Sequence, residues 1–125
     1  MVMQKHILCV SYDEFLLVTR RMLLEKQGYK VTPALTSQEA TARCRPGDKF
    51  DLFILGHSIP RIDQQQMMKT FREHSPAPIL SLRRQGEPIV PGADYYSLPD
   101  EPDRFLEEIA NILAQGSRSK PPGSK

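Results

Sequence analysis

The chain has no tryptophan, only two cysteines and no long apolar run. A membrane-spanning helix needs about 20 consecutive apolar residues, so we expect no membrane contact. The first residues lead directly into a predicted strand and show no signal-peptide pattern, which favours a cytoplasmic location. Cys9 and Cys44 have neither metal-site nor disulfide spacing, and we expect both to be reduced residues of the packed interior.

The chain also lacks a strong excess of charge of either sign. Its formal net charge is +2, and Arg118, Lys120 and Lys125 lie in the last ten residues, which contain no acid. Without these three the remainder is nearly neutral, which argues against a nucleic-acid partner. The length of 125 residues suits one domain. We predict that this domain covers residues 1–115 and that residues 116–125 form a disordered tail or linker.

The most informative stretch is residues 50–60, which read FDLFILGHSIP. A short apolar run bounded by turn residues predicts a strand that is buried on both faces, as at the centre of a parallel sheet. Ligands of open parallel sheets bind at the carboxyl ends of the strands. Gly56 stands at that end, and it has no side chain with which to do chemistry.

Strands and helices alternate along the rest of the chain. Similar apolar runs predict strands within residues 6–10, 29–34, 78–82 and 93–98. Capping boxes at Ser11-x-x-Glu14 and Thr36-x-x-Glu39 predict two helix starts. Further helices are expected from about residues 63 and 100, the last with Asp100 as its N-cap. This alternation with short connections predicts a doubly wound α/β fold.

Residues 83–91 follow the predicted fourth strand and read RRQGEPIVP. Gly86, Pro88 and Pro91 oppose a helix of two or three turns. We therefore expect a single short turn or an irregular loop there.

Three stretches in this order resemble the receiver domain of response regulators, the CheY-like phosphoacceptor module of two-component signalling. They are the first strand with its helix up to Gly28, residues 50–63, and residues 92–96. The resemblance covers about residues 5–115. It implies a flavodoxin-like, CheY-like three-layer sandwich whose five parallel strands have the order 2-1-3-4-5, here with helix 4 shortened or missing.

The resemblance also shows what the chain has in place of the family's reactive groups. The phosphoacceptor Asp after the third strand corresponds to Gly56, and the Mg²⁺-binding acidic pair corresponds to Ser11-Tyr12, with an acid only at Asp13. Arg83 replaces the Thr or Ser after the fourth strand, and Leu98 stands before the proline where a Lys is expected. We interpret these as a vestigial pocket formed by Ser11, Tyr12, Asp13, Gly56, Arg83 and Leu98. We expect no catalytic residue, metal or cofactor, and no enzyme activity.

The replacements leave alternatives open. Ser11 is read as the N-cap of the first helix. Tyr12 either fills the space of the metal or is a solvated first-turn residue. Arg83 is either solvated or reaches Asp13 in an ion pair that substitutes for Mg²⁺ and Lys. As in the family, we expect a cis peptide bond before Pro99.

The leading hypothesis is a pseudo-receiver that signals through protein contact without being phosphorylated. Its contact surface would use the shortened segment and the fifth strand, where Tyr95 is read as the family's switch aromatic; dimerisation through the fifth strand and last helix is one form of such contact. Either an apolar patch stays uncovered there or the loop folds over it. The expected partner-binding residues are Arg83, Arg84, Ile89, Val90 and Tyr95.

Two alternatives come from other classes. One is a working phosphorelay receiver with an atypical acceptor, His57 or Ser58. The other is a small flavodoxin-like enzyme or nucleotide binder. The latter is disfavoured because the loop after the first strand, residues 10–14, lacks a Gly-rich phosphate cradle.

Overall fold

The computed structural model describes residues 4–44, 49–98 and 101–116. Their centre is one parallel sheet with the strand order β2-β1-β3-β4-β5. This confirms the predicted fold class and strand order. The strands are β1 (His6–Val10), β2 (Lys30–Ala34), β3 (Leu52–Leu55), β4 (Ile79–Leu82) and β5 (Tyr95–Ser97).

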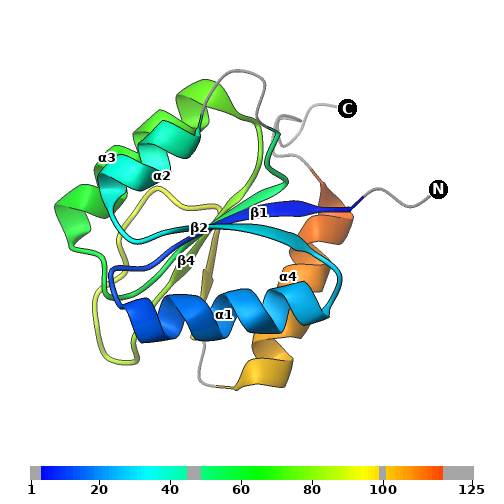
Figure 1. Ribbon diagram of the computed structural model, residues 1–125. Helices are drawn as coiled ribbons and strands as arrows, with labels where there is room; N and C mark the ends of the chain where they lie inside the picture. The colour runs from blue at the N-terminus through cyan, green and yellow to red at the C-terminus, as the bar shows by residue number, and fades with distance from the viewer. Residues whose placement is uncertain (1–3, 45–48, 99–100, 117–125) are drawn as a thin grey trace, which may run out of the picture.

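Helices cover both faces of the sheet (Figure 1). Helices α2 (Ser37–Arg43) and α3 (Arg61–His74) lie on one face, and α1 (Glu14–Lys26) and α4 (Pro102–Gln115) lie on the other. The three-layer arrangement predicted from the resemblance is therefore present. Within the described residues, no helix is both long and apolar enough to span a membrane.

The sheet separates two hydrophobic cores because successive side chains of a strand point to opposite faces. In β1, Leu8 and Val10 pack on the α2/α3 side, and Ile7 and Cys9 pack on the α1/α4 side. All of β3 is buried, as expected for a central strand. Burial of each large side chain stabilises the fold by roughly 1.5–3 kcal/mol, so this sheet holds the domain together.

The segment between β4 and β5 contains no helix, as predicted from its Gly and Pro residues. It runs as a loop along the carboxyl edge of the sheet (Figure 1). The loop begins with a turn, in which the Glu87 amide donates to the Arg84 carbonyl at 3.1 Å. Tyr96 fixes its second half, because its hydroxyl donates to the Val90 carbonyl (2.8 Å) and accepts from the Ala93 amide (3.3 Å).

The prediction that Ser11 caps the first helix is wrong. Asp13 is the N-cap of α1, and its carboxylate accepts the amide of Leu16 at 3.1 Å. Ser11 is held further back by the sheet, since its amide donates to the Ala34 carbonyl on β2. Its hydroxyl instead accepts the Asp13 amide at 3.2 Å. Two residues upstream of the cap, Ser11 thus orders the turn that places Asp13.

Two other terminus predictions are confirmed. Thr36 caps α2 by accepting the Glu39 amide, and Glu39 reaches back to the Leu35 amide at 2.7 Å. Gly28 ends the α1 turn with φ +94°, a conformation that glycine adopts without a steric penalty. Asp100, the peptide bond before Pro99 and residues 117–125 lie outside the described residues, and with them the predicted cap, the cis bond and all but the first residue of the predicted tail.

Candidate functional site at the carboxyl edge of the sheet

The residues read as a vestigial pocket lie where four neighbouring strands end. Ser11 follows β1, Gly56 follows β3, Arg83 follows β4 and Leu98 follows β5. The amide of Gly56 donates to the Val10 carbonyl at 2.9 Å, and the amide of Arg83 donates to the Ser97 carbonyl at 2.9 Å. The backbone hydrogen bonds of the sheet thus continue one residue beyond the strands and fix the relative positions of these residues.

The space beside Gly56 is occupied by an arginine from α1. A Cβ atom added to Gly56 would lie 2.9 Å from Nη1 of Arg20, 3.2 Å from the Val10 carbonyl oxygen and 3.4 Å from Cβ of Ser11. A contact under 3.0 Å means that an atom has to shift, and here it is the end of the Arg20 side chain. The guanidinium of Arg20 therefore lies where an acceptor side chain at position 56 would begin.

Arg20 is a buried cation, with only 6% of its surface exposed. Among the residues that the structure describes, its Nη1 has no hydrogen-bond partner. Desolvation lowers the pKa of Arg20, while Cys9 and Asp13 act in the opposite direction. Burial also raises the pKa of the Cys9 thiol to about 11, so Cys9 stays neutral. A buried charge with an unbonded nitrogen is costly, which makes Arg20 the most unusual residue of this edge.

The residues at this position do not fit Mg²⁺. This hard cation requires oxygen ligands, chiefly carboxylates, and the nearest candidate, Asp13, is exposed and caps α1. The Arg20 charge would repel a divalent cation beside Gly56. In the part of the chain that the structure describes, no group of three or more His, Cys, Asp or Glu side chains could hold a metal.

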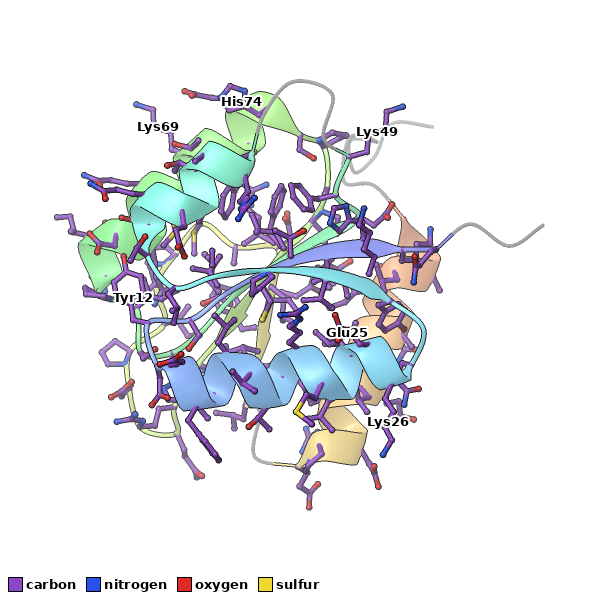
Figure 2. All side chains as sticks on the ribbon, in the orientation of Figure 1. Tyr12, Glu25, Lys26, Lys49, Lys69 and His74 are labelled. Atoms are coloured by element: carbon purple, nitrogen blue, oxygen red, sulfur yellow. The ribbon has the colours of Figure 1, made fainter. Side chains whose placement is uncertain are left out.

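Tyr12 turns towards α3. Its hydroxyl donates to the Asp63 carboxylate at 2.7 Å, and its ring packs against the core on the α2/α3 side. Figure 2 shows it at the carboxyl edge, away from Lys49 and His74. Burial raises the pKa of Tyr12; hydrogen bonding with Ser37 lowers it, and the bond to Asp63 raises it. Tyr12 is therefore neither a solvated residue nor an occupant of the space beside Gly56: it ties the β1–α1 loop to the start of α3.

The hypothesis that Arg83 forms an ion pair with Asp13 is wrong. The ion pairs between described residues do not include it. Leu82 packs on the α1/α4 side, so strand alternation directs Arg83 to the α3 side. There Arg83 lines a cavity of about 300 Å³ together with His57, Arg61, Gln64, Ser81 and Glu87. Its Nε atom is buried and has no hydrogen-bond partner among the described residues.

Other polar groups of this cavity are engaged with one another. The Ser81 hydroxyl donates to Gln64 Oε1 at 3.2 Å, and Gln64 Nε2 donates to the Ile59 carbonyl at 2.9 Å. Arg84 Nη2 donates to His57 Nδ1 at 3.3 Å. Desolvation, then the charges of Arg20 and Arg84, lower the pKa of His57. His57 is therefore neutral near pH 7, and because Nδ1 accepts, Nε2 carries the proton.

The predicted contact surface is only partly apolar and exposed. Ile89 is 43% exposed, while Val90 packs against the core on the α2/α3 side. Tyr95 packs on the opposite side, and its hydroxyl donates to Gln115 of α4 at 2.9 Å. Tyr96, which pairs in register with Ser81, is the aromatic residue on the face of Arg83. The loop thus covers part of the expected patch and leaves Ile89 out.

Sequence reasoning missed Arg20, Arg61 and the Ser81–Gln64 pair. Arg20 had a detectable signal, because Leu17, Arg20 and Leu24 have helical i, i+3, i+7 spacing and are the buried residues of α1. An arginine within an apolar stripe marks a buried cation.

The fold is shared by solved receiver domains. A CheY-like response regulator receiver domain from Methanospirillum hungatei JF-1 matches with a TM-score of 0.76 and 24% identity, over 90% of this chain and 96% of that one. A two-component response regulator from Clostridium difficile matches with a TM-score of 0.77 and 22% identity, over 90% and 98% of the two chains. At these identities the likeness shows the CheY-like fold.

A third solved structure and one curated protein are also similar to this chain. A response regulator from Burkholderia pseudomallei, described with a phosphorylated aspartic acid, a calcium ion and citrate, matches with a TM-score of 0.70 and 21% identity, over 90% of this chain and 70% of that one. The alkaline phosphatase synthesis transcriptional regulatory protein PhoP of Bacillus subtilis (strain 168) is 27% identical over 127 aligned positions. That match covers 95% of this chain but 52% of PhoP. No protein-family model matches the sequence.

Proposed function

We propose that this chain is a receiver-like module of two-component signalling that acts in the cytoplasm through protein contact, without phosphorylation at residue 56 and without enzyme activity. The CheY-like fold and the similarity to PhoP support the signalling context. Gly56 at the acceptor position supports the absence of phosphoryl transfer, since it offers no nucleophilic side chain.

The proposal depends on one observation: the guanidinium group of Arg20 lies against Gly56. Phosphoryl transfer in such a site depends on a positioned acceptor and on a metal that neutralises the phosphoryl oxygens. Here a protein cation fills the position of the acceptor side chain and opposes metal binding. The acceptor and the metal are therefore both missing beside Gly56, so restoring either one alone should not restore phosphoryl transfer.

The test is incubation of the full chain with Mg²⁺ and acetyl phosphate, followed by denaturing intact-mass analysis. We expect no covalent phosphoryl adduct on the wild-type chain or on Gly56→Asp. The double variant Gly56→Asp/Arg20→Ala frees the space beside the new carboxylate and is the matched comparison. A slow adduct on the double variant alone supports the role of Arg20, whereas an adduct on the wild-type chain would overturn the proposal.

The variants His57→Gln and Ser58→Ala locate any wild-type adduct. Loss of the adduct in one of them would identify an atypical acceptor and make the chain a working phosphorelay receiver. We expect both variants to match the wild type, with no adduct. If the proposal holds, the contact with a protein partner, including a second copy of this chain, becomes the output to search for by cross-linking and sedimentation.

A further inference from the structure

The cavity next to Arg83 has an unusual balance of donors and acceptors. Two arginines, Arg61 from the start of α3 and Arg83 from the end of β4, line its volume of about 300 Å³. His57, from the loop after β3, adds the N–H of Nε2, because its Nδ1 accepts from Arg84. Donors from three separate elements thus meet around one space.

Acceptors do not balance these donors. Gln64 and Ser81 are bonded to each other, as described above. Glu87 is the one acidic side chain of the lining, and its carboxylate lies 3.8 Å from Nη1 of Arg84. Beside its apolar residues Ile59, Leu82, Pro88 and Val90, the lining therefore contains two arginines and a histidine but one acidic residue, which already has a cationic partner. Beside the cavity, the Nε of Arg83 is buried and also lacks an acceptor among the described residues, although buried donors are nearly always bonded.

We propose that this cavity binds a small tetrahedral oxyanion of the phosphate class non-covalently. Such an anion accepts hydrogen bonds in several directions and so suits donors from three elements. Arginine guanidinium groups match phosphate oxygens in geometry and charge. The start of α3 is compatible with this choice, because its N-cap residue Pro60 makes no side-chain cap bond; the acid of its first turn, Asp63, does not line the cavity.

The cavity is separate from the space beside Gly56. Neither Gly56 nor Arg20 lines the cavity, and Arg20 comes from α1, on the other face of the sheet from α3 (Figure 1). Binding of an anion at Arg83 therefore requires neither an acceptor residue nor a metal. The inference goes beyond the proposed function and stands or fails separately, since a non-covalent anion leaves no adduct on the denatured chain.

The test is an NMR titration of the full, ¹⁵N-labelled chain with inorganic phosphate at constant ionic strength. We expect saturable shifts confined to the amides of residues 57–59, 61–64 and 81–87. Acetate and chloride serve as parallel arms, and we expect neither to reproduce the saturation. Acetate binding as tight as phosphate would overturn the assignment to the phosphate class, and non-saturating shifts would overturn the site.

Variants make the test specific. Loss of a charge-assisted bond in Arg83→Gln should weaken phosphate binding about tenfold or more. Glu87→Gln removes the opposing charge and should tighten binding about two- to fivefold. Lys69→Gln is the control, because Lys69 is an exposed cation elsewhere on α3 (Figure 2). Equal effects of Arg83→Gln and Lys69→Gln would show only general charge attraction and contradict the proposal.

Folding of each variant is checked from the dispersion of the same spectra. Should Arg83→Gln disturb the fold, Arg61→Gln is the second variant, since Arg61 is an exposed residue of the same lining. We expect it to weaken binding severalfold. An unchanged affinity in Arg61→Gln would remove one of the two guanidinium groups from the site and overturn the proposed geometry.

Discussion

Arg20 and Arg83 lie at the same edge of the sheet but on opposite faces, and the structure treats them differently. Arg20 comes from within a helix, is buried and closes the space beside Gly56. Arg83 comes from the end of a strand, is half-buried and lines an open cavity. Each has one buried nitrogen without a hydrogen-bond partner among the described residues. An arginine side chain can therefore either close a space or line an open cavity, depending on which elements cover it.

The covering elements explain the difference. On the α1 face, an intact helix of 13 residues holds Arg20 between Leu17 and Leu24 against the sheet. On the α3 face, the segment after β4 forms no helix, and its Pro and Gly residues leave a loop around the cavity. Four predictions test this contrast, from the largest expected effect to the smallest.

Filling the space beside Gly56 should have the largest effect. Gly56→Val adds three carbon atoms against Arg20 and the Val10 carbonyl, so we expect a loss of about 3 kcal/mol in the free energy of unfolding. The same substitution in an Arg20→Ala background should cost at least about 1 kcal/mol less. Urea unfolding of the four proteins measures this coupling. Additive effects would mean that the backbone, and not Arg20, limits the space.

Replacing the buried cation should stabilise the protein. Arg20→Met keeps a long, unbranched side chain but removes a buried charge without a close partner, and we expect a gain of about 1–3 kcal/mol in the free energy of unfolding. Arg83→Met, on the more open face, should change it by less than about 0.5 kcal/mol. Urea unfolding at pH 7 compares the two. A loss of stability in Arg20→Met would contradict the view of Arg20 as an uncompensated charge.

The two neighbouring tyrosines of β5 should contribute unequally to stability. Tyr96 is bonded to the loop around the cavity, and Tyr95 is bonded to α4. Tyr96→Phe removes two hydrogen bonds that hold the loop around the cavity, and we expect a loss of about 1–2 kcal/mol. Tyr95→Phe removes one exposed bond to Gln115 and should cost only about 0.5 kcal/mol. Thermal unfolding gives the order. The reverse order would show that the contact with α4, and not the loop, anchors β5.

The smallest expected effect is on the pKa of His57, which depends on the charges near the carboxyl edge of the sheet. Desolvation, Arg20 and Arg84 lower its pKa, so the folded protein binds the proton less well than the unfolded chain. The stability due to neutral His57 is present above its ordinary pKa of about 6.5 and decreases as the pH falls below that value. NMR titration should place its pKa below 6.5, and Arg84→Gln should raise it. No change in Arg84→Gln, with Lys69→Gln as control, would contradict the assigned contact.

The strands could be predicted from sequence because they are short apolar runs, whereas their order in the sheet came from the resemblance to receiver domains. The run at Leu52–Leu55 has no polar residue, is short and ends at glycine, so only a central strand fits it. The loss of the helix after β4 was equally accessible, since Pro88 and Pro91 act through local geometry. The cap at Thr36 followed from a local motif. Features set by neighbouring residues or by apolar composition were thus predictable.

The site was harder because it depends on contacts between distant residues. Ser11 and Asp13 both fit the rules for an N-cap, and only the pairing of Ser11 with β2 decides for Asp13. Arg83 and Asp13 have opposite charges, but strand alternation separates them. Tyr95 and Tyr96 are adjacent, and the register of β5 alone determines which one faces Arg83.

Arg20 escaped notice because α1 carries apolar residues on both sides. Phe15, Val18 and Met22 are exposed, while Leu17 and Leu24 are buried. The stripe of Leu17, Arg20 and Leu24 is therefore one of two apolar faces, and the sequence alone does not say which of the two is buried. The decisive observation, a cation against a glycine 36 positions later in the sequence, requires the fold to be known.

The two outer strands of the sheet limit how the chain can aggregate or assemble. β2 contains Pro33, which lacks an amide donor, and β5 is only three residues long. Both edges therefore offer few groups for pairing with a strand of another molecule. Extension of the sheet by another strand is therefore disfavoured, and contacts through side-chain surfaces are the easier route to assembly.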